Sequence, residues 1–247
     1  MFILKEGEWN NMRYHNITKD DMLNGSGLRV VLWLSGCNHK CPGCQNPITW
    51  NPDEGLLFDD KAKKEIFEQL NENYISGLTL TGGDPLHEKN IHEVYDLICE
   101  VKEKYPTKNI WIYSGYMYSY LAKSEQNYEE LMKDLLDEEN KRKFCEYYSE
   151  NNYRCLVEST KEDNEIRKKI VELCDVFCDG PFVLVKRDTK LHWVGSSNQC
   201  VLDMNKMKQI ETMLKEKEKE TKEFFVVSGQ LLMDLKDQLN DKEKIAI

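Results

Sequence analysis

Three cysteines in one short loop constrain this chain more than any other feature. Cys37, Cys41 and Cys44 lie within eight residues and directly follow the apolar run 30–34. Such a run is typical of a buried strand, and Pro42 with Gly43 allows the chain to turn back after it. Thiolates at this spacing can converge on one metal centre. The fold must therefore deliver a metal-binding loop from the end of a strand.

Three cysteines leave the identity of the centre open. A structural zinc ion or an electron-transfer [4Fe-4S] cluster normally has four protein ligands, and no fourth cysteine lies near this loop. A cluster held by three cysteines would leave one iron free to bind a substrate. Alternatively, His39 supplies a fourth ligand, and the loop is the zinc knuckle of an interaction protein without a reaction of its own. A disulfide framework is disfavoured, because nine cysteines are an odd number spread over 247 residues.

Composition narrows the classes of partner. The length of 247 residues suits one sizeable α/β core, and the net charge of −10 argues against binding to nucleic acid or to an anionic membrane. The first residues lack the pattern of a secretory signal, and no apolar stretch approaches the roughly 20 residues that span a bilayer. We therefore expect a cytoplasmic protein whose partners are proteins or small molecules.

Hydrophobic patterns along the chain predict alternating strands and helices. We expect strands at 28–35, 78–81, 110–113 and 175–179, and helices from Asp59 to Leu70, over 91–101 and over 166–173. This alternation implies parallel strands, with ligand chemistry at their carboxyl ends. The cysteine loop, the loop 82–85 and the loop 114–116 each follow a strand, so we expect these three loops to lie together.

The remaining segments complete the predicted organisation. We expect a leader over 1–11, a core over 12–205 that contains a charged insertion at about 122–165, and a helical extension over 206–247. The insertion is predicted to hold one short helix, and the extension a helix from Lys206 to about Thr221, a strand over 224–227 and a helix over 231–239. A further strand is expected over 190–194, and Arg29 is interpreted as a solvated surface charge.

Several separate motifs occur in the order found in one family. They are Asn24–Gly27, Leu34–Cys37, Cys41–Cys44, Thr49-Trp50, Thr81–Leu86, Ile110-Trp111, Gly115-Tyr116, Asp179-Gly180 and Gly195–Gln199. Together they resemble the radical-SAM enzymes and, within that superfamily, the proteins that activate anaerobic ribonucleoside-triphosphate reductases. The resemblance covers most of 12–203 except the insertion. The chain departs from the pattern at Gly43, where many radical-SAM enzymes have an aromatic residue, and at Val194, where the family often has arginine.

The resemblance implies a fold, two cofactors and a partner. The fold would be α/β, an open, partial β/α barrel of the radical-SAM type. Cys37, Cys41 and Cys44 would hold a [4Fe-4S] cluster, and the residues lining the S-adenosylmethionine site would be Gly43, Cys44, Gln45, Gly82, Gly83 and Asp84. No catalytic residue is expected beyond the cluster and the cofactor, because the sequence offers no Ser/His/Asp triad or Walker loop.

The same resemblance implies a reaction. A low-potential donor such as flavodoxin or ferredoxin would supply an electron, the carbon–sulfur bond of S-adenosylmethionine would break homolytically, and the 5'-deoxyadenosyl radical would take hydrogen from a glycine of the class III reductase. An activase of a different glycyl-radical enzyme is the alternative that the cysteine loop does not exclude.

Overall fold

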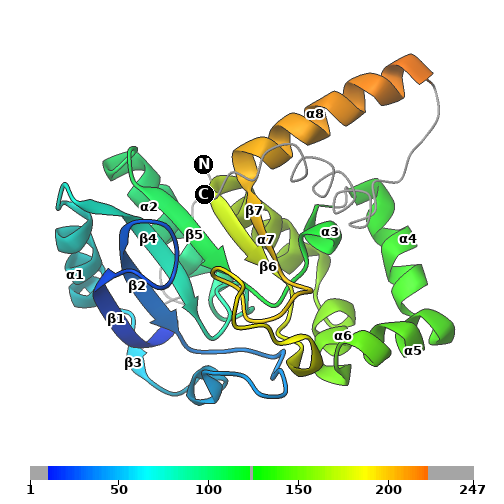
Figure 1. Cartoon of the computed structure of the whole chain (residues 1–247), viewed down its shortest axis with the longest axis horizontal. Helices are drawn as coiled ribbons and strands as arrows, with labels where there is room; N and C mark the ends of the chain where they lie inside the picture. The colour runs from blue at the N-terminus through cyan, green and yellow to red at the C-terminus, as the bar shows by residue number, and fades with distance from the viewer. Residues whose placement is uncertain (1–10, 123–124, 222–247) are drawn as a thin grey trace.

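A seven-stranded mixed sheet forms the centre of the protein (Figure 1). The computed structural model describes residues 11–122 and 125–221. The strands are β1 (Arg13–Asp21), β2 (Leu28–Leu34), β3 (Leu56–Leu57), β4 (Ile75–Gly82), β5 (Asn109–Tyr113), β6 (Val176–Asp179) and β7 (Cys200–Asp203). Their order in the sheet is β3-β1-β2-β4-β5-β6-β7. The sheet is open, and the four central strands run parallel, as the alternation of strands and helices predicts.

Helices connect and flank these strands. They are α1 (Asp60–Leu70), α2 (Ile91–Lys104), α3 (Tyr118–Leu121), α4 (Glu125–Leu135), α5 (Glu138–Tyr147), α6 (Glu150–Val157), α7 (Lys161–Leu173) and α8 (Met204–Thr221). Two short 3-10 helices, η1 (Pro47–Thr49) and η2 (Leu184–Lys186), lie in loops. The described chain is therefore a mixed α/β protein, which confirms the predicted class.

One face of the sheet packs against helices. Alternate residues of the parallel strands, such as Leu32, Leu80 and Ile112, are fully buried and adjacent in register. The apolar faces of α1, α2 and α7 cover them and form one core with them. α1 begins where Asp59 accepts a hydrogen bond from the Ala62 amide, as the sequence pattern indicates. This face is the rigid support for the loops at the carboxyl ends of the strands.

The other face is covered by the segment 180–199, which we call the covering loop. Trp193 of this loop packs edge-on against Trp111 of β5, with ring centroids 5.0 Å apart. The expected strand over 190–194 is wrong, because this stretch forms turns that cross the sheet without pairing to it. This face also carries Arg29, Thr79 and Cys178, which alternate along their strands with the residues that face the helices.

Arg29 is fully buried, which corrects its interpretation as a surface charge. Its guanidinium donates to Thr79 Oγ1, Asn109 Oδ1 and three backbone carbonyls, and it lies 5.3 Å from the Trp111 ring centroid. These acceptors replace the water that a buried cation loses. Burial lowers the pKa of Arg29 to about 10, at which the side chain is still charged at neutral pH.

Three further differences from the predicted elements have physical causes. β1 was missed because its residues are polar and mostly half-exposed, without an apolar alternation. The charged insertion was expected to hold one helix but holds α4, α5 and α6, whose capping residues Asp137 and Ser149 separate them. α8 begins two residues earlier than expected, and its Met204 and Met207 are buried in the core.

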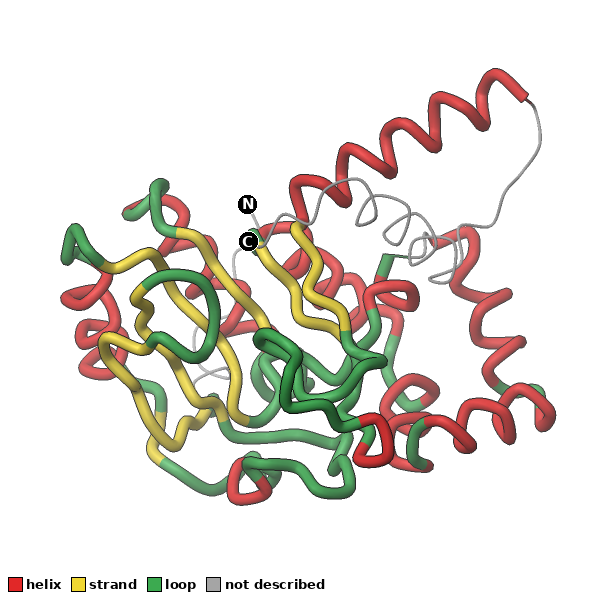
Figure 2. Tube along the Cα trace, viewed as in Figure 1, coloured by secondary structure: helices red, strands yellow, loops and turns green. Residues whose placement is uncertain are grey.

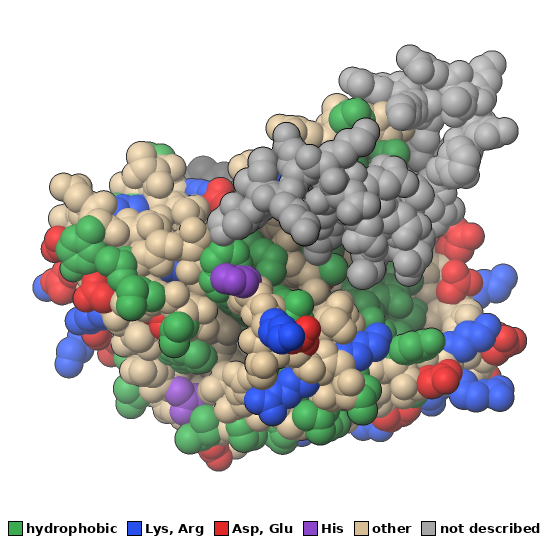
Figure 3. All heavy atoms as spheres, viewed as in Figure 1, with side chains coloured by type: hydrophobic (Ala, Val, Ile, Leu, Met, Phe, Trp, Pro, Cys, Tyr) green, Lys and Arg blue, Asp and Glu red, His purple; other side chains and the backbone are tan. Residues whose placement is uncertain are grey.

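The outer surface carries both signs of charge. Figure 3 shows acidic and basic side chains together on both flanks of the visible face. Among the residues that the structure describes, no helix is long and apolar enough to cross a membrane. Residues 1–10 of the predicted leader over 1–11, and the strand and helix predicted beyond 221, lie outside the described residues, and the predicted domain boundaries stay predictions.

Candidate metal centre

The loops that follow β2 and β4 are in direct backbone contact. The Gly83 amide donates to the Leu34 carbonyl (2.8 Å), and the Asp84 amide donates to the Gly36 carbonyl (2.7 Å). A Cβ atom on Gly83 would lie 2.5 Å from the Gly36 carbonyl oxygen, so no side chain fits there. Figure 2 shows these loops gathered at one end of the parallel strands. The start of the cysteine loop is therefore anchored by Gly83 and Asp84 of the neighbouring loop.

Left-handed residues shape the cysteine loop itself. Lys40 and Gly43 have φ angles of 45° and 76°, and the Cys44 amide donates to the Cys41 carbonyl at 3.0 Å. Cys41 is buried, Cys37 and Cys44 are half-buried, and Gly43 and Gln45 are exposed. In the described part of the chain, no three His, Cys, Asp or Glu side chains meet at one point as the ligands of a single ion do. The three cysteines therefore lie in one loop, but their side chains do not meet at a single point.

Each of the three sulfurs has N–H donors beside it. The Asn46 amide donates to Cys44 Sγ at 3.3 Å, the Phe182 amide lies beside Cys41, and the amides of His39 and Lys40 lie beside Cys37. Burial raises the pKa of Cys41 to about 11 and that of Cys37 well above its ordinary value, although these donors lower both. A bound cation would favour the thiolate forms of Cys37 and Cys41, and backbone N–H groups around cysteine sulfurs are what an iron–sulfur cluster uses. The donor set fits a [4Fe-4S] cluster.

Asp84 is buried and is fully occupied by protein groups. Its carboxylate accepts hydrogen bonds from the Leu86 amide (2.8 Å), the Ser114 hydroxyl (2.9 Å) and the Gly115 amide (2.9 Å). His39 Nε2 lies 3.0 Å from Asp84 Oδ2. Burial alone would raise the pKa of Asp84, but His39 and the backbone donors together hold it below its ordinary value. This carboxylate joins the three loops that the sequence predicts to lie together.

Both ring nitrogens of His39 lie beside a polar side chain. Its side chain is only 3% exposed, with Nε2 at Asp84 and Nδ1 3.2 Å from the Asn152 side-chain amide nitrogen. The Tyr116 ring packs edge-on against it at 4.8 Å between centroids. A Cβ atom on Gly115 would lie 2.4 Å from the His39 ring, so this ring fills the space beside that glycine. The arrangement disfavours the Cys3His zinc knuckle, because zinc binds a nitrogen lone pair that is free.

Sequence reasoning missed the contribution of the insertion to this site. Asn152 of α6 reaches both His39 and Cys41 Sγ, the latter at 3.8 Å. Cys155, on the same helix, is buried and lies beside His39. No spacing signal predicts this contact, because 113 positions separate Asn152 from His39. Only the return of the chain through three helices brings the two together.

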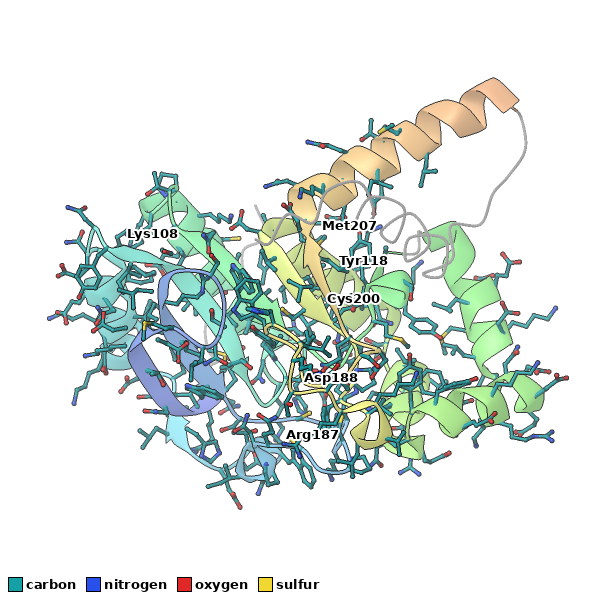
Figure 4. The ribbon with its side chains drawn as sticks, in the orientation of Figure 1. Lys108, Tyr118, Arg187, Asp188, Cys200 and Met207 are labelled. Carbon is teal, nitrogen blue, oxygen red and sulfur yellow. The ribbon has the colours of Figure 1, made fainter. Side chains whose placement is uncertain are left out.

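The polar run 195–199 fastens the two ends of the covering loop to each other. Gln199 Oε1 accepts hydrogen bonds from the Gly195 and Ser196 amides, and Gln199 Nε2 donates to the Gly180 carbonyl at 2.9 Å. Between these ends, Leu184 lies so close to Gly43 that a Cβ atom there would be 2.9 Å from Leu184 Cδ1. Figure 4 labels Arg187 and Asp188 on this loop, in front of the sheet. The covering loop therefore borders the cysteine loop.

Comparisons with known proteins agree with this site. The family model described as a 4Fe-4S single cluster domain matches residues 23–140 and 139–202. An anaerobic ribonucleoside-triphosphate reductase-activating protein of Enterobacteria phage T4 is 46% identical over 114 residues, which are 46% of this chain and 73% of the relative. The proteins of the same name from Escherichia coli K12 and Haemophilus influenzae are 32% and 31% identical over 192 residues, which are 77% of this chain and 97% of each relative.

The fold and the cysteine loop thus define a protein with a single-cluster 4Fe-4S domain. Within this class, the chain belongs to the family of anaerobic ribonucleoside-triphosphate reductase-activating proteins. The family resemblance noted from the sequence motifs is confirmed.

Proposed function

We propose that this protein is a radical-SAM activase that generates the glycyl radical of the anaerobic, class III ribonucleoside-triphosphate reductase. The observation that carries the proposal is the loop of three cysteines whose sulfurs have N–H donors beside them, in a chain of this family. When bound, the cluster would supply the electron that cleaves S-adenosylmethionine reductively, and the resulting radical would remove hydrogen from a glycine of the reductase. Flavodoxin or ferredoxin is the proposed class of electron donor.

The residues proposed to act on the cofactors divide into two groups. Cys37, Cys41 and Cys44 hold the cluster, while Gly43 and Gln45 are exposed beside it and are available to contact S-adenosylmethionine. Gly82, Gly83 and Asp84 form the second group, proposed to line the same site from the neighbouring strand.

The geometry sharpens the role of this second group. The amides of Gly83 and Asp84 already donate to the cysteine loop, and an amino group could reach the Asp84 carboxylate only by displacing a protein donor. We therefore infer that Asp84 acts mainly as a positioning residue, by orienting His39 and holding the three loops together. Backbone carbonyls of the glycines remain the natural partners for an ammonium group.

The open sheet corresponds, in this proposal, to the partial barrel of radical-SAM enzymes. Of its four parallel strands, β2 leads into the cysteine loop and β4 into the loop that contacts it, and the covering loop packs on the face opposite the helices. Such closure would keep water and oxygen away from a radical. The cytoplasm, a reducing compartment, suits free cysteines and this chemistry.

Substitution of a single cysteine tests the proposal. Anaerobically reconstituted protein should hold about four iron and four sulfide per chain and cleave S-adenosylmethionine when reduced. Cys41→Ala should abolish cleavage, whereas Cys99→Ala, on α2 away from the loop, should retain it. Cys155→Ala is a poorer control, because Cys155 lies beside His39.

The partner is tested separately, by electron paramagnetic resonance. With the anaerobic reductase of the same organism, the reduced protein should produce a glycyl-radical signal on the reductase. A signal on a different glycyl-radical enzyme alone would contradict the choice of partner. Colourless protein with one zinc per chain and an intact fold would instead support the zinc knuckle.

A further inference from the structure

We infer that the insertion supplies a residue that tunes the metal centre: Asn152 of α6 donates a hydrogen bond to the Cys41 sulfur and positions the cysteine loop. This inference rests on the proposed function, because it takes Cys41 as a cluster ligand. It goes beyond that function by giving the charged insertion a role at the cluster.

The side chain of Asn152 is held in one orientation. It is 3% exposed, and its carbonyl oxygen accepts from the Ser149 amide (3.1 Å) and hydroxyl (2.8 Å) at the start of α6. This reciprocal cap leaves the NH2 group facing the cysteine loop, where it lies 3.2 Å from His39 Nδ1 and 3.8 Å from Cys41 Sγ. The two protons of the amide thus match two acceptors.

Burial makes this donor influential. Cys41 is buried, and the Asn152 amide nitrogen lies 3.8 Å from its sulfur. In such surroundings a hydrogen bond to a charged sulfur is stronger than it would be in water. Reduction adds negative charge to a cluster and its thiolates, so an N–H donor stabilises the reduced state and raises the reduction potential.

Three variants test the inference. Asn152→Ala removes the donor, and Asn152→Asp keeps the cap but replaces the donor with a carboxylate. Asn151→Asp is the matched control, because it adds the same charge one position earlier on the same helix. The readout is the midpoint potential of the reconstituted cluster, measured by redox titration with electron paramagnetic resonance, without S-adenosylmethionine or the reductase.

We expect Asn152→Ala to shift the midpoint potential to a more negative value, Asn152→Asp to shift it further, and Asn151→Asp to shift it less than either. Loss of iron from both Asn152 variants, with an unchanged circular dichroism spectrum and an iron-replete Asn151→Asp control, supports the same role. Asn152 variants with full iron and potentials no lower than that of Asn151→Asp overturn the inference. In that case the iron content and cofactor cleavage of the wild type still decide the proposed function, whereas a wild type without iron overturns both.

Discussion

The cysteine loop is held from two sides, and the two contacts differ in kind. On the core side, Gly83 and Asp84 touch it through backbone atoms and a buried carboxylate. On the side of the insertion, a single amide of Asn152 reaches it from a short helix. The core contact leaves no space for another atom, whereas the contact from the insertion depends on one polar side chain.

This difference suggests a division of roles. The core contact sets the shape of the loop. Altering it should be costly, because the surrounding structure cannot easily adjust to an unpaired buried group or to a collision with backbone atoms. The contact from the insertion adjusts the surroundings of one sulfur, and its loss should alter the centre more than the fold. The three predictions that follow test this ordering, from the largest expected effect to the smallest.

Asp84→Asn should lower the free energy of unfolding by about 3 kcal/mol, because it removes the buried charge and replaces one accepting oxygen by an NH2 group that faces the donors of Ser114, Gly115 or His39. Urea denaturation measures the loss. Asp53→Asn is the control, because Asp53 pairs with Lys89 on the surface and its loss should change little.

The pH dependence of stability provides a second test of Asp84→Asn. The pKa of Asp84 is held below the ordinary value of 3.8, so its contribution is present above that pH and is lost as the pH falls through the lower value in the folded state. The difference between wild type and Asp84→Asn should therefore shrink in strong acid. Equal destabilisation by Asp53→Asn and Asp84→Asn at neutral pH would contradict the special weight of the core contact.

Gly83→Ala should destabilise the protein by about 1 to 3 kcal/mol, because its Cβ atom would lie 2.5 Å from the Gly36 carbonyl oxygen, which is backbone. Gly195→Ala is the matched comparison, since the nearest atoms to its Cβ atom would be side-chain atoms, the Phe182 ring at 3.1 Å and Gln199 Oε1 at 3.8 Å. In thermal unfolding, Gly83→Ala should have a clearly lower midpoint temperature than Gly195→Ala. The reverse order would show that the two loops separate more easily than their contacts indicate.

Tyr153→Phe should cost about 1 kcal/mol, since it removes the hydrogen bond from the buried Tyr153 hydroxyl to the Leu135 carbonyl, which joins α6 to α4. Tyr147→Phe, on the exposed side of α5, should leave stability unchanged. Hydrogen exchange over α4 to α6 is the measurement. Faster exchange in the core strands as well would show that the insertion and the core unfold together.

The sequence alone determined the parallel α/β arrangement and the identity of the loop that carries the chemistry. Both depend on local patterns: buried strands such as 30–34 are continuous apolar runs, and the cysteine spacing lies within eight residues. The family motifs lie in the same local stretches, which is why the resemblance is visible without a structure.

Other features were decided only by the tertiary structure. The burial of Arg29, the polar neighbours of both His39 nitrogens and the approach of Asn152 to Cys41 depend on residues 45 to 113 positions apart, whose proximity no local pattern encodes. From the sequence alone, a polar side chain is predicted to be solvated. Packing in the folded protein removes the water around it, and the partners that replace this water come from other elements of the fold. For this reason the metal-binding loop follows from the sequence, while the groups that hold and tune it follow from the fold.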